Sequence, residues 1–307
     1  MAVLRLPAQI IAMEADREMR LHHMLWHTAR NGWLRFPPQT QQAFDHLGWA
    51  PPRPAIDADK KPILTNRSGE DFLFMHRQMI AAVNERLAEI ADPACPKIEG
   101  WDSFPALGDA DFPVPPEYTL PTAAGPDPDL VKVKSDDFFT QTFQPRERQF
   151  TDVDNLRSMS LGELGAKIEF SVHNWAHRRW AKKPAIVRPN ASGADPAGVD
   201  PRFDALSYDW LEDFYSSHVN PTFWKLHGWV DDRIDGWMAA NGVAEGEFEW
   251  TGTWTGPKDM HDMHAAHAHP ARPATVAQDA PVSDAERLLQ LAAEAGVEAS
   301  PRDAALA

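Results

Sequence analysis

The sequence predicts a mainly α-helical protein, built as an antiparallel four-helix bundle whose helices are joined by long irregular connections. In four segments apolar residues recur at helical spacing, and proline-rich stretches without such a pattern separate them. The chain has 307 residues, of which 43% are hydrophobic, enough to bury a full core. We find no internal repeat. The four helical segments are expected to pack as one antiparallel bundle.

Stripes of apolar residues predict the first two helices. One runs from about residue 7 to about residue 31, and the other from about residue 68 to about residue 90. The second has an apolar stripe from Phe72 to Leu87 and meets a stop signal at Asp92-Pro93. Both predicted helices therefore have one face for the core.

Capping patterns mark the other two long helices. The third is expected from about residue 160 to about residue 180 and opens with Ser160 and Glu163, the spacing of a capping box. The fourth is expected at about 220–241, where Asn241 and Gly242 form a C-terminal stop. A shorter amphipathic helix is predicted at about 283–295.

The connections and the tail differ from the helices in composition. Residues 93–154 and 182–204 are long connections rich in proline, and such loops usually serve a function or wrap the core. We divide the chain into a core domain, 1–255, and a tail, 256–307, with a histidine-rich linker. Three interpretations of this linker are open: it is a polar tract, it recruits copper for the centre, or the tail folds over the mouth of the site as a lid. Its histidines are His261, His264, His267 and His269.

Composition narrows the classes of function. The net charge of −15 disfavours binding to nucleic acid or anionic membranes, because both require a basic surface. Cys95 is the single cysteine, so the chain has no intramolecular disulfide and no cysteine-based metal site. The N-terminus does not resemble a signal peptide, and no segment reaches the roughly 20 apolar residues of a membrane span. A cytoplasmic location is expected.

The placement of the histidines is the most informative feature. His23 and His27 stand four apart on the first predicted helix, and His173 and His177 stand four apart on the third. Residues four apart share one helix face, so two imidazoles placed in this way can reach one metal ion. One such pair arises easily by chance and is more often surface or core, but two pairs on separate helices favour ligation.

The second and fourth predicted helices each add one histidine, His76 and His227. Together with the two pairs they make two three-histidine sites in the core of the bundle. Imidazoles suit copper, zinc, iron or nickel. The Glu-x-x-His motifs of di-iron bundles and the His-Glu-x-x-His motif of zinc proteases are absent from these helices. Three neutral imidazoles per ion without a carboxylate favour copper, which predicts a dinuclear copper centre.

Four strings in the sequence resemble type-3 copper proteins, the family of tyrosinases, phenoloxidases and hemocyanins. GEDFLFMHRQMIAAVNERL, around His76, is similar to the first-copper helix of arthropod hemocyanins and prophenoloxidases, and LHHMLWH is similar to the segment before it. HNWAH resembles the second-copper His-Asn-x-x-His, and NPTFWKLHGWVDD resembles the segment of the last ligand. The order of the motifs matches the family. Leu226 precedes the last ligand, as in the hemocyanin branch, whereas tyrosinases have a histidine there.

The resemblance implies two copper ions that bind dioxygen between them. It implies oxidation, with ortho-hydroxylation as an option, of a small aromatic substrate: a phenol, a catechol or an o-aminophenol. A hemocyanin-like dioxygen or copper binder and a three-histidine zinc or iron hydrolase remain as alternatives. The implied ligands are His23, His27 and His76 for one copper and His173, His177 and His227 for the other.

Two further residues receive a catalytic role from the resemblance. In the tyrosinase branch, an asparagine after the first ligand of the second copper and a nearby glutamate hold a water that deprotonates the phenol. Here Asn174 follows His173, and Glu169 lies four residues before it. A glutamate in an apolar cavity can have a raised pKa and act as a base. A solvated position, or a hydrogen bond to a ligand imidazole, are the alternatives for Glu169.

Three residues near the motifs have weaker assignments. His22 adjoins a ligand but points about 100° around the helix, so we expect it to pack in the core. His218 is a candidate for lining the mouth of a pocket. Asp231 is expected to orient a ligand imidazole or to cap a neighbouring group.

Overall fold

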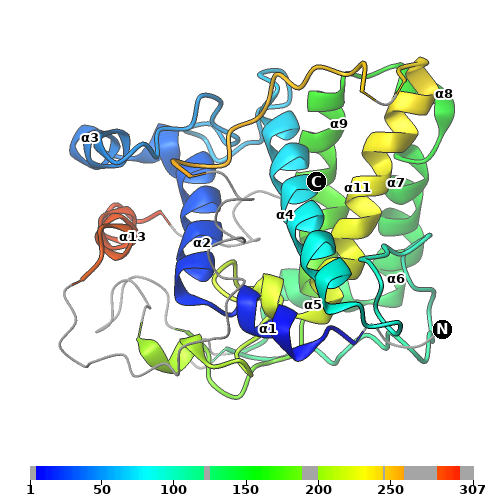
Figure 1. Cartoon of the computed structure of the whole chain (residues 1–307), viewed down its shortest axis with the longest axis horizontal. Coiled ribbons are helices and arrows are strands. Elements are labelled where there is room, and N and C mark those ends of the chain that lie inside the picture. Colours follow the sequence, from blue (N-terminus) through cyan, green and yellow to red (C-terminus); the bar gives the residue numbers. More distant parts are fainter. Residues whose placement is uncertain (1–4, 121–124, 189–199, 245, 259–281, 298–307) are drawn as a thin grey trace.

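The computed structural model describes residues 5–120, 125–188, 200–244, 246–258 and 282–297 (Figure 1). Within these ranges the protein is mainly α-helical, as predicted, and an isolated antiparallel bridge joins Ile56 to Pro62. The α-helices are α1 (Ala8–Glu14), α2 (Arg17–Gly32), α3 (Pro38–His46), α4 (Ser68–Ile90), α5 (Pro128–Lys134), α6 (Asp136–Phe138), α7 (Gln144–Gln149), α8 (Val153–Arg157), α9 (Leu161–Ile168), α10 (Asn174–Arg179), α11 (Pro221–Asn241) and α13 (Asp284–Glu294).

The helix predicted at 7–31 is two helices, α1 and α2. Asp16 separates them because it has extended backbone angles and its side chain accepts a hydrogen bond from the backbone N–H of Glu18. It is therefore the N-cap of α2, a position that aspartate favours. The apolar spacing continues across this break, which is why the sequence pattern alone concealed it.

The helix predicted at 160–180 continues along the expected path but is interrupted. Between α9 and α10 lies η3 (Glu169–His173), a π-helical turn in which Phe170 leaves helical geometry with φ −94° and ψ 15°. Such turns insert one extra residue into a helix and often occur at functional sites. At the start of α9, Ser160 caps the backbone N–H of Glu163, as predicted.

The other two long helices agree with the prediction. α4 covers Ser68–Ile90 and ends at Ala91 in the left-handed conformation, just before Asp92-Pro93. α11 is capped by the side chain of Asn220 and ends at Gly242, whose φ of +66° suits glycine.

The connection predicted at 93–154 contains four short helical segments that the sequence did not predict. They are α5, α6, the π-helical turn η2 (Phe139–Phe143) and α7, and α8 begins at its end. None has a long apolar stripe, so each is held by packing on the core. Phe139 and Phe143, for example, are fully buried. A further helix, α3, was also missed.

Close glycine contacts bring α4 and α9 together. A Cβ added at Gly69 would lie 2.0 Å from the backbone N of Ala166, and one at Gly165 would lie 2.1 Å from the carbonyl O of Gly69. α4 also packs against α11 (Figure 1). The backbone of α2 lies mainly against α1, α13 and η1 (Trp33–Arg35), so it reaches α4 and α9 through side chains.

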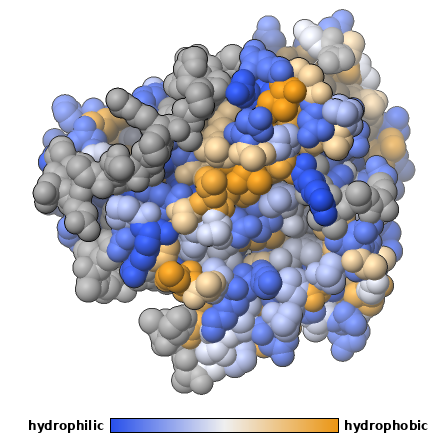
Figure 2. Space-filling view, turned by 60° about the horizontal axis from the view of Figure 1, so that its bottom comes forward, coloured by the Kyte–Doolittle hydropathy of each residue, from blue (hydrophilic) through white to orange (hydrophobic). Residues whose placement is uncertain are grey.

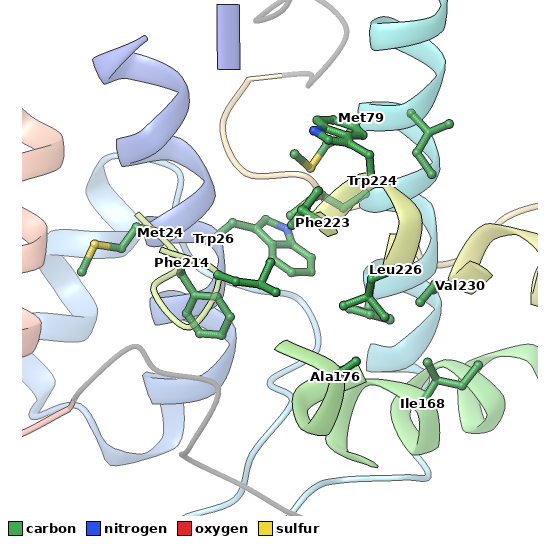
Figure 3. Close-up of a cluster of buried hydrophobic side chains, with 14 of the residues drawn as sticks. Met24, Trp26, Met79, Ile168, Ala176, Phe214, Phe223, Trp224, Leu226 and Val230 are labelled. Atoms are coloured by element: carbon green, nitrogen blue, oxygen red, sulfur yellow. The ribbon is translucent and has the colours of Figure 1, made fainter. Parts of the chain in front are cut away.

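The space between these helices is filled by large apolar side chains. Figure 3 shows Trp26 of α2, Met79 of α4, and Phe223 and Leu226 of α11 pointing into one cluster. All four are buried, as is Phe214 from the loop before α11. The core therefore lies between α2 on one side and α4, α9 and α11 on the other, where the histidines also lie.

The C-terminal helix α13 packs against α2 and α3. Its buried face consists of Leu288, Leu289 and Ala292. Glu286 also forms an ion pair with Arg17 at the start of α2. The four tail histidines lie outside the described residues.

In the described part of the chain, few large apolar side chains are exposed. The face in Figure 2 is mostly polar, with a band of apolar residues near its centre and smaller apolar patches around it. No helix in the described part of the chain is long and apolar enough to cross a membrane.

Candidate metal centre

The six histidines predicted as ligands come together in the core. All six are buried, with at most 2% of each exposed. They come from four segments of the chain that are far apart in the sequence. His23 and His27 lie on α2, His76 on α4, His173 at the end of η3, His177 on α10 and His227 on α11.

Two sets of three imidazoles have their nitrogen atoms within 4.8 Å of one another. The first set is His23, His27 and His76, and the second is His76, His173 and His227, so His76 belongs to both. His177 joins the second set, because its Nε2 lies 3.1 Å from Nε2 of His173. The rings of His76 and His227 stack with centroids 4.4 Å apart, so the two sets are adjacent.

Backbone carbonyls lie within hydrogen-bond distance of Nδ1 in five of the six rings, closely in four of them and at 3.3 Å for His173 to Glu169. A carbonyl oxygen can only accept, so each of these Nδ1 atoms carries the proton, and Nε2 keeps its lone pair. Metal-binding histidines are usually held in this way. The Nδ1···O distances are 2.6 Å for His23 to Phe214, 2.8 Å for His76 to Phe72, 2.7 Å for His177 to Leu211 and 2.8 Å for His227 to Phe223.

The Nε2 lone pairs of the second set point towards one another, and none of these Nε2 atoms carries a proton to donate to the others. Nε2 of His173 lies 3.1 Å from Nε2 of His227 and 3.1 Å from Nε2 of His177. A proton on His173 Nε2 satisfies one of these contacts but not both, whereas a cation satisfies all three nitrogens. Two ligands of a tetrahedral ion with bonds of about 2.0–2.1 Å lie about 3.3 Å apart, close to the observed spacing. The donor set therefore fits a metal ion.

The first set supports the same conclusion through unpaired atoms. Nε2 of His23, Nε2 of His76 and Nδ1 of His27 are buried and have no hydrogen-bond partner. An unpaired buried polar atom costs about 1–3 kcal/mol, so three in one place require an explanation. A cation bound by the three nitrogens supplies it.

The imidazoles are neutral at physiological pH, as metal ligands must be. Burial lowers the pKa of His23 to about 3 and that of His177 to about 4. Burial and neighbouring imidazoles also lower the pKa values of the other four well below 6.5.

A loop before α11 supports ligands from both sets. It supplies the carbonyls of Leu211 and Phe214, and the Phe214 ring stacks on His27 at 3.9 Å. Between them, Asp213 is buried and accepts hydrogen bonds from Arg188 at 2.8 and 2.9 Å. The loop was not predicted as part of the site, since it acts mainly through carbonyl groups that every residue has.

The two predicted catalytic residues are both buried beside His173. The Asn174 side-chain oxygen lies 3.2 Å from His173 Nδ1, so Asn174 helps to orient this ring. Glu169 lies at the start of η3, and its carboxylate forms two hydrogen bonds with Arg30, at 2.6 and 3.0 Å. Burial raises the pKa of Glu169, and the Arg30 guanidinium acts against that shift.

Three neighbouring residues differ in their outcomes. His22 packs in the core, as expected, with Nε2 2.6 Å from the carbonyl of Thr255. His218 is fully buried with its ring 4.6 Å from that of His23, so it lies inside the cluster rather than at a pocket mouth. Asp231 pairs at 2.6 Å with Arg77, next to His76 on α4, so of its two expected roles it holds a neighbouring group rather than a ligand imidazole.

Comparison with known proteins adds no family to this picture. Neither a scan against protein-family models nor a search of curated proteins finds a match. The geometry of the histidines therefore carries the functional argument.

Proposed function

We propose that this protein is a copper-dependent oxidoreductase that uses dioxygen to oxidise small phenolic substrates, in the manner of tyrosinases and catechol oxidases. The observation that carries the proposal is the meeting of two buried imidazole sets whose nitrogen lone pairs face one another. Dinuclear sites of this kind act on a ligand held between two ions.

Copper is the metal that the donor set favours. Neither nitrogen set contains a carboxylate or a thiolate within the described residues, and imidazole ligands suit copper. We assign His23, His27 and His76 to one ion. We assign His173, His177 and His227 to the other, in a four-helix arrangement of α2, α4, α9–α10 and α11.

When bound, the two copper ions would supply dioxygen binding and a change of oxidation state at each metal. The residues of the chain would hold the imidazoles neutral, orient them through Nδ1 and keep water out. Phe223 stacks on His227 at 3.7 Å and Phe214 on His27 at 3.9 Å, so aromatic faces border both sets. These surfaces are compatible with a phenol, a catechol or an o-aminophenol.

Metal analysis and oxygen uptake test the proposal. The protein is loaded with copper, freed of excess metal and offered a monophenol, a catechol and an o-aminophenol in turn. Two copper ions per chain and uptake with any substrate are expected, and the preferred substrate defines the activity. Zinc or iron retained in place of copper would support the three-histidine hydrolase and overturn the proposal.

A hemocyanin-like dioxygen or copper binder is the second candidate. The observation in its favour is the burial of all six ligands, which suits a diatomic molecule better than an aromatic ring. Copper-loaded protein whose absorption changes reversibly with oxygen, but which turns over none of the three substrates, would establish the binder instead.

A further inference from the structure

Arg30 is a fully buried arginine one helical turn beyond His27 on α2. Its Nη1 donates to Oε1 of Glu169 at 2.6 Å, and its Nη2 donates to Oε2 at 3.0 Å. Nη2 also donates to the backbone carbonyl of Ser68 at 2.8 Å. Both side chains are at most 3% exposed, so water does not screen the pair.

These contacts join three of the four segments that carry the ligands. Ser68 is the first residue of α4, which carries His76, and Glu169 is the first residue of η3, which ends at His173. The backbone carbonyl of Glu169 also lies 3.3 Å from His173 Nδ1. One guanidinium therefore links α2 to the helix of the shared ligand and to the turn of the second set.

The aromatic packing extends this link to the first set. The guanidinium carbon of Arg30 lies 4.2 Å from the centre of the Trp26 ring. Trp26 in turn meets His27 edge-on at 4.9 Å and His76 at 6.0 Å. Because the α2 backbone has little direct packing on α4 and α9, side-chain links such as this one determine where α2 lies.

We propose that the Arg30–Glu169 ion pair fixes the position of the first imidazole set relative to the second, which makes Glu169 a positioning residue rather than the base. The inference rests on the proposed dicopper function. A base must exchange a proton with the substrate. A carboxylate whose two oxygens are both held by a guanidinium would lose that pairing on protonation and leave a buried charge unpaired.

A double-mutant cycle tests the pair. The variants are Arg30→Met, Glu169→Gln and the two combined, and the measurements are copper affinity and the EPR signal of the Cu(II)-loaded protein. Two closely spaced, coupled Cu(II) ions give little signal, whereas uncoupled ions give a strong one. Each single variant should bind copper about 10–100-fold more weakly and gain signal. The double variant should regain only the part of the affinity that the unpaired charge cost, and its EPR signal should stay raised, because no ion pair is left to hold the two sets together.

Measurements on the wild-type protein test the dicopper function separately from the positioning role of the ion pair. If it holds no copper pair with a weak EPR signal, the dicopper function fails, whatever the variants do. If it does, and Arg30→Met leaves affinity and signal unchanged, the positioning role is wrong. Loss of monophenol turnover in Glu169→Gln with a wild-type EPR signal, while Arg30→Met stays active, would instead establish Glu169 as the base.

Two further variants guard against misfolding. Arg30→Lys keeps the charge but cannot donate to both carboxylate oxygens and to Ser68 in the same geometry, so a smaller change of the same sign is expected. Arg53→Met is the matched control, since Arg53 forms a two-bond pair with Asp71 at 2.8 and 2.9 Å. That pair joins α4 to the loop before it and does not link two ligand-bearing segments, so its loss should leave the EPR signal unchanged.

Discussion

The two histidine pairs have the same spacing in the sequence but rest on different kinds of helix. His23 and His27 lie on the regular helix α2, whereas His173 ends a π-helical turn and His177 follows in α10. The ring centroids are 4.8 Å apart in the first pair and 4.5 Å in the second. Spacing therefore fixes the separation of the rings, and the helix type does not change it much.

The support around the two pairs differs more. Nδ1 of His173 and of His177 each face an oxygen acceptor, whereas in the first pair this holds for His23 alone and His27 Nδ1 has no partner. The second pair lies on η3 and α10, which pack on each other and on α9 and α5, whereas α2 reaches α4 and α9 through side-chain links. We infer that packing preforms the second set and that the first set is the more easily disturbed.

Both pairs consist of buried imidazoles with lowered pKa values, so low pH should destabilise the protein, and this should be the largest of the predicted effects. Their pKa values are lowered by burial, so the unfolded chain binds more protons than the folded one below about pH 6.5. Stability of the metal-free protein should be complete above that pH. It should then fall by up to about 1.4 kcal/mol per pH unit for each such histidine, until the pH reaches the folded pKa. Urea unfolding of metal-free protein at pH 7.5, 6 and 5 measures this fall, and equal stability at all three would contradict it.

The close approach of α4 and α9 can be broken at one residue. Gly165→Ala would place a Cβ 2.1 Å from the carbonyl O of Gly69, so the two backbones must separate. We expect a loss of about 4 kcal/mol, above the usual 1–3 for overpacking. Gly236→Ala is the control, because its Cβ would meet nothing nearer than Leu156 at 3.8 Å. That variant should be as stable as the wild type or about 1 kcal/mol more stable in urea unfolding. Equal behaviour of the two variants would show that the contact is unimportant.

Much of this arrangement could be predicted from the sequence, because it depends on side chains with a clear pattern. The apolar stripe of α4 and the caps of α11 gave their bounds closely. The spacing of the histidines identified the six ligand candidates, and all six lie in one cluster. These signals are local, and each resides in the identity of a few residues.

The groups that orient and hold the ligand histidines could not be recognised from the sequence. The carbonyls of Leu211 and Phe214 act through backbone atoms, so their residue types carry no mark of the role. Arg30 and Glu169 are 139 residues apart in the sequence, and nothing local pairs them. The π-helical turn also gave no warning, since one extra residue leaves the apolar pattern readable on both sides.

Removal of single ligands distinguishes the shared imidazole from an outer one. His76 belongs to both nitrogen sets, whereas His27 belongs to the first alone. His76 is assigned to the first ion through Nε2, and its ring also stacks on His227 of the second set at 4.4 Å. His76→Ala should therefore release the first metal and, in addition, weaken the second by about 10–100-fold, as the loss of a supporting partner does. His27→Ala should release one metal and leave the second bound. Copper per chain after gel filtration measures both, with the exposed His46→Ala as the control. Retention of both metals by His76→Ala would contradict the shared position.

The smallest expected effect concerns the weaker support of the first pair. The Phe214 ring lies flat on His27, with an angle of 4° between the planes, and it is the closest aromatic contact of this imidazole. Phe214→Leu keeps the carbonyl that orients His23 but removes the stacking, which contributes about 0.5–1.5 kcal/mol for aromatic pairs. The first metal should then bind about tenfold more weakly, with the second unaffected. Titration with a competing chelator should remove the two metals in two phases, and each phase gives the affinity of one metal. A uniform loss in both phases would mean that Phe214 acts on the whole core, and that the two sets do not differ in support.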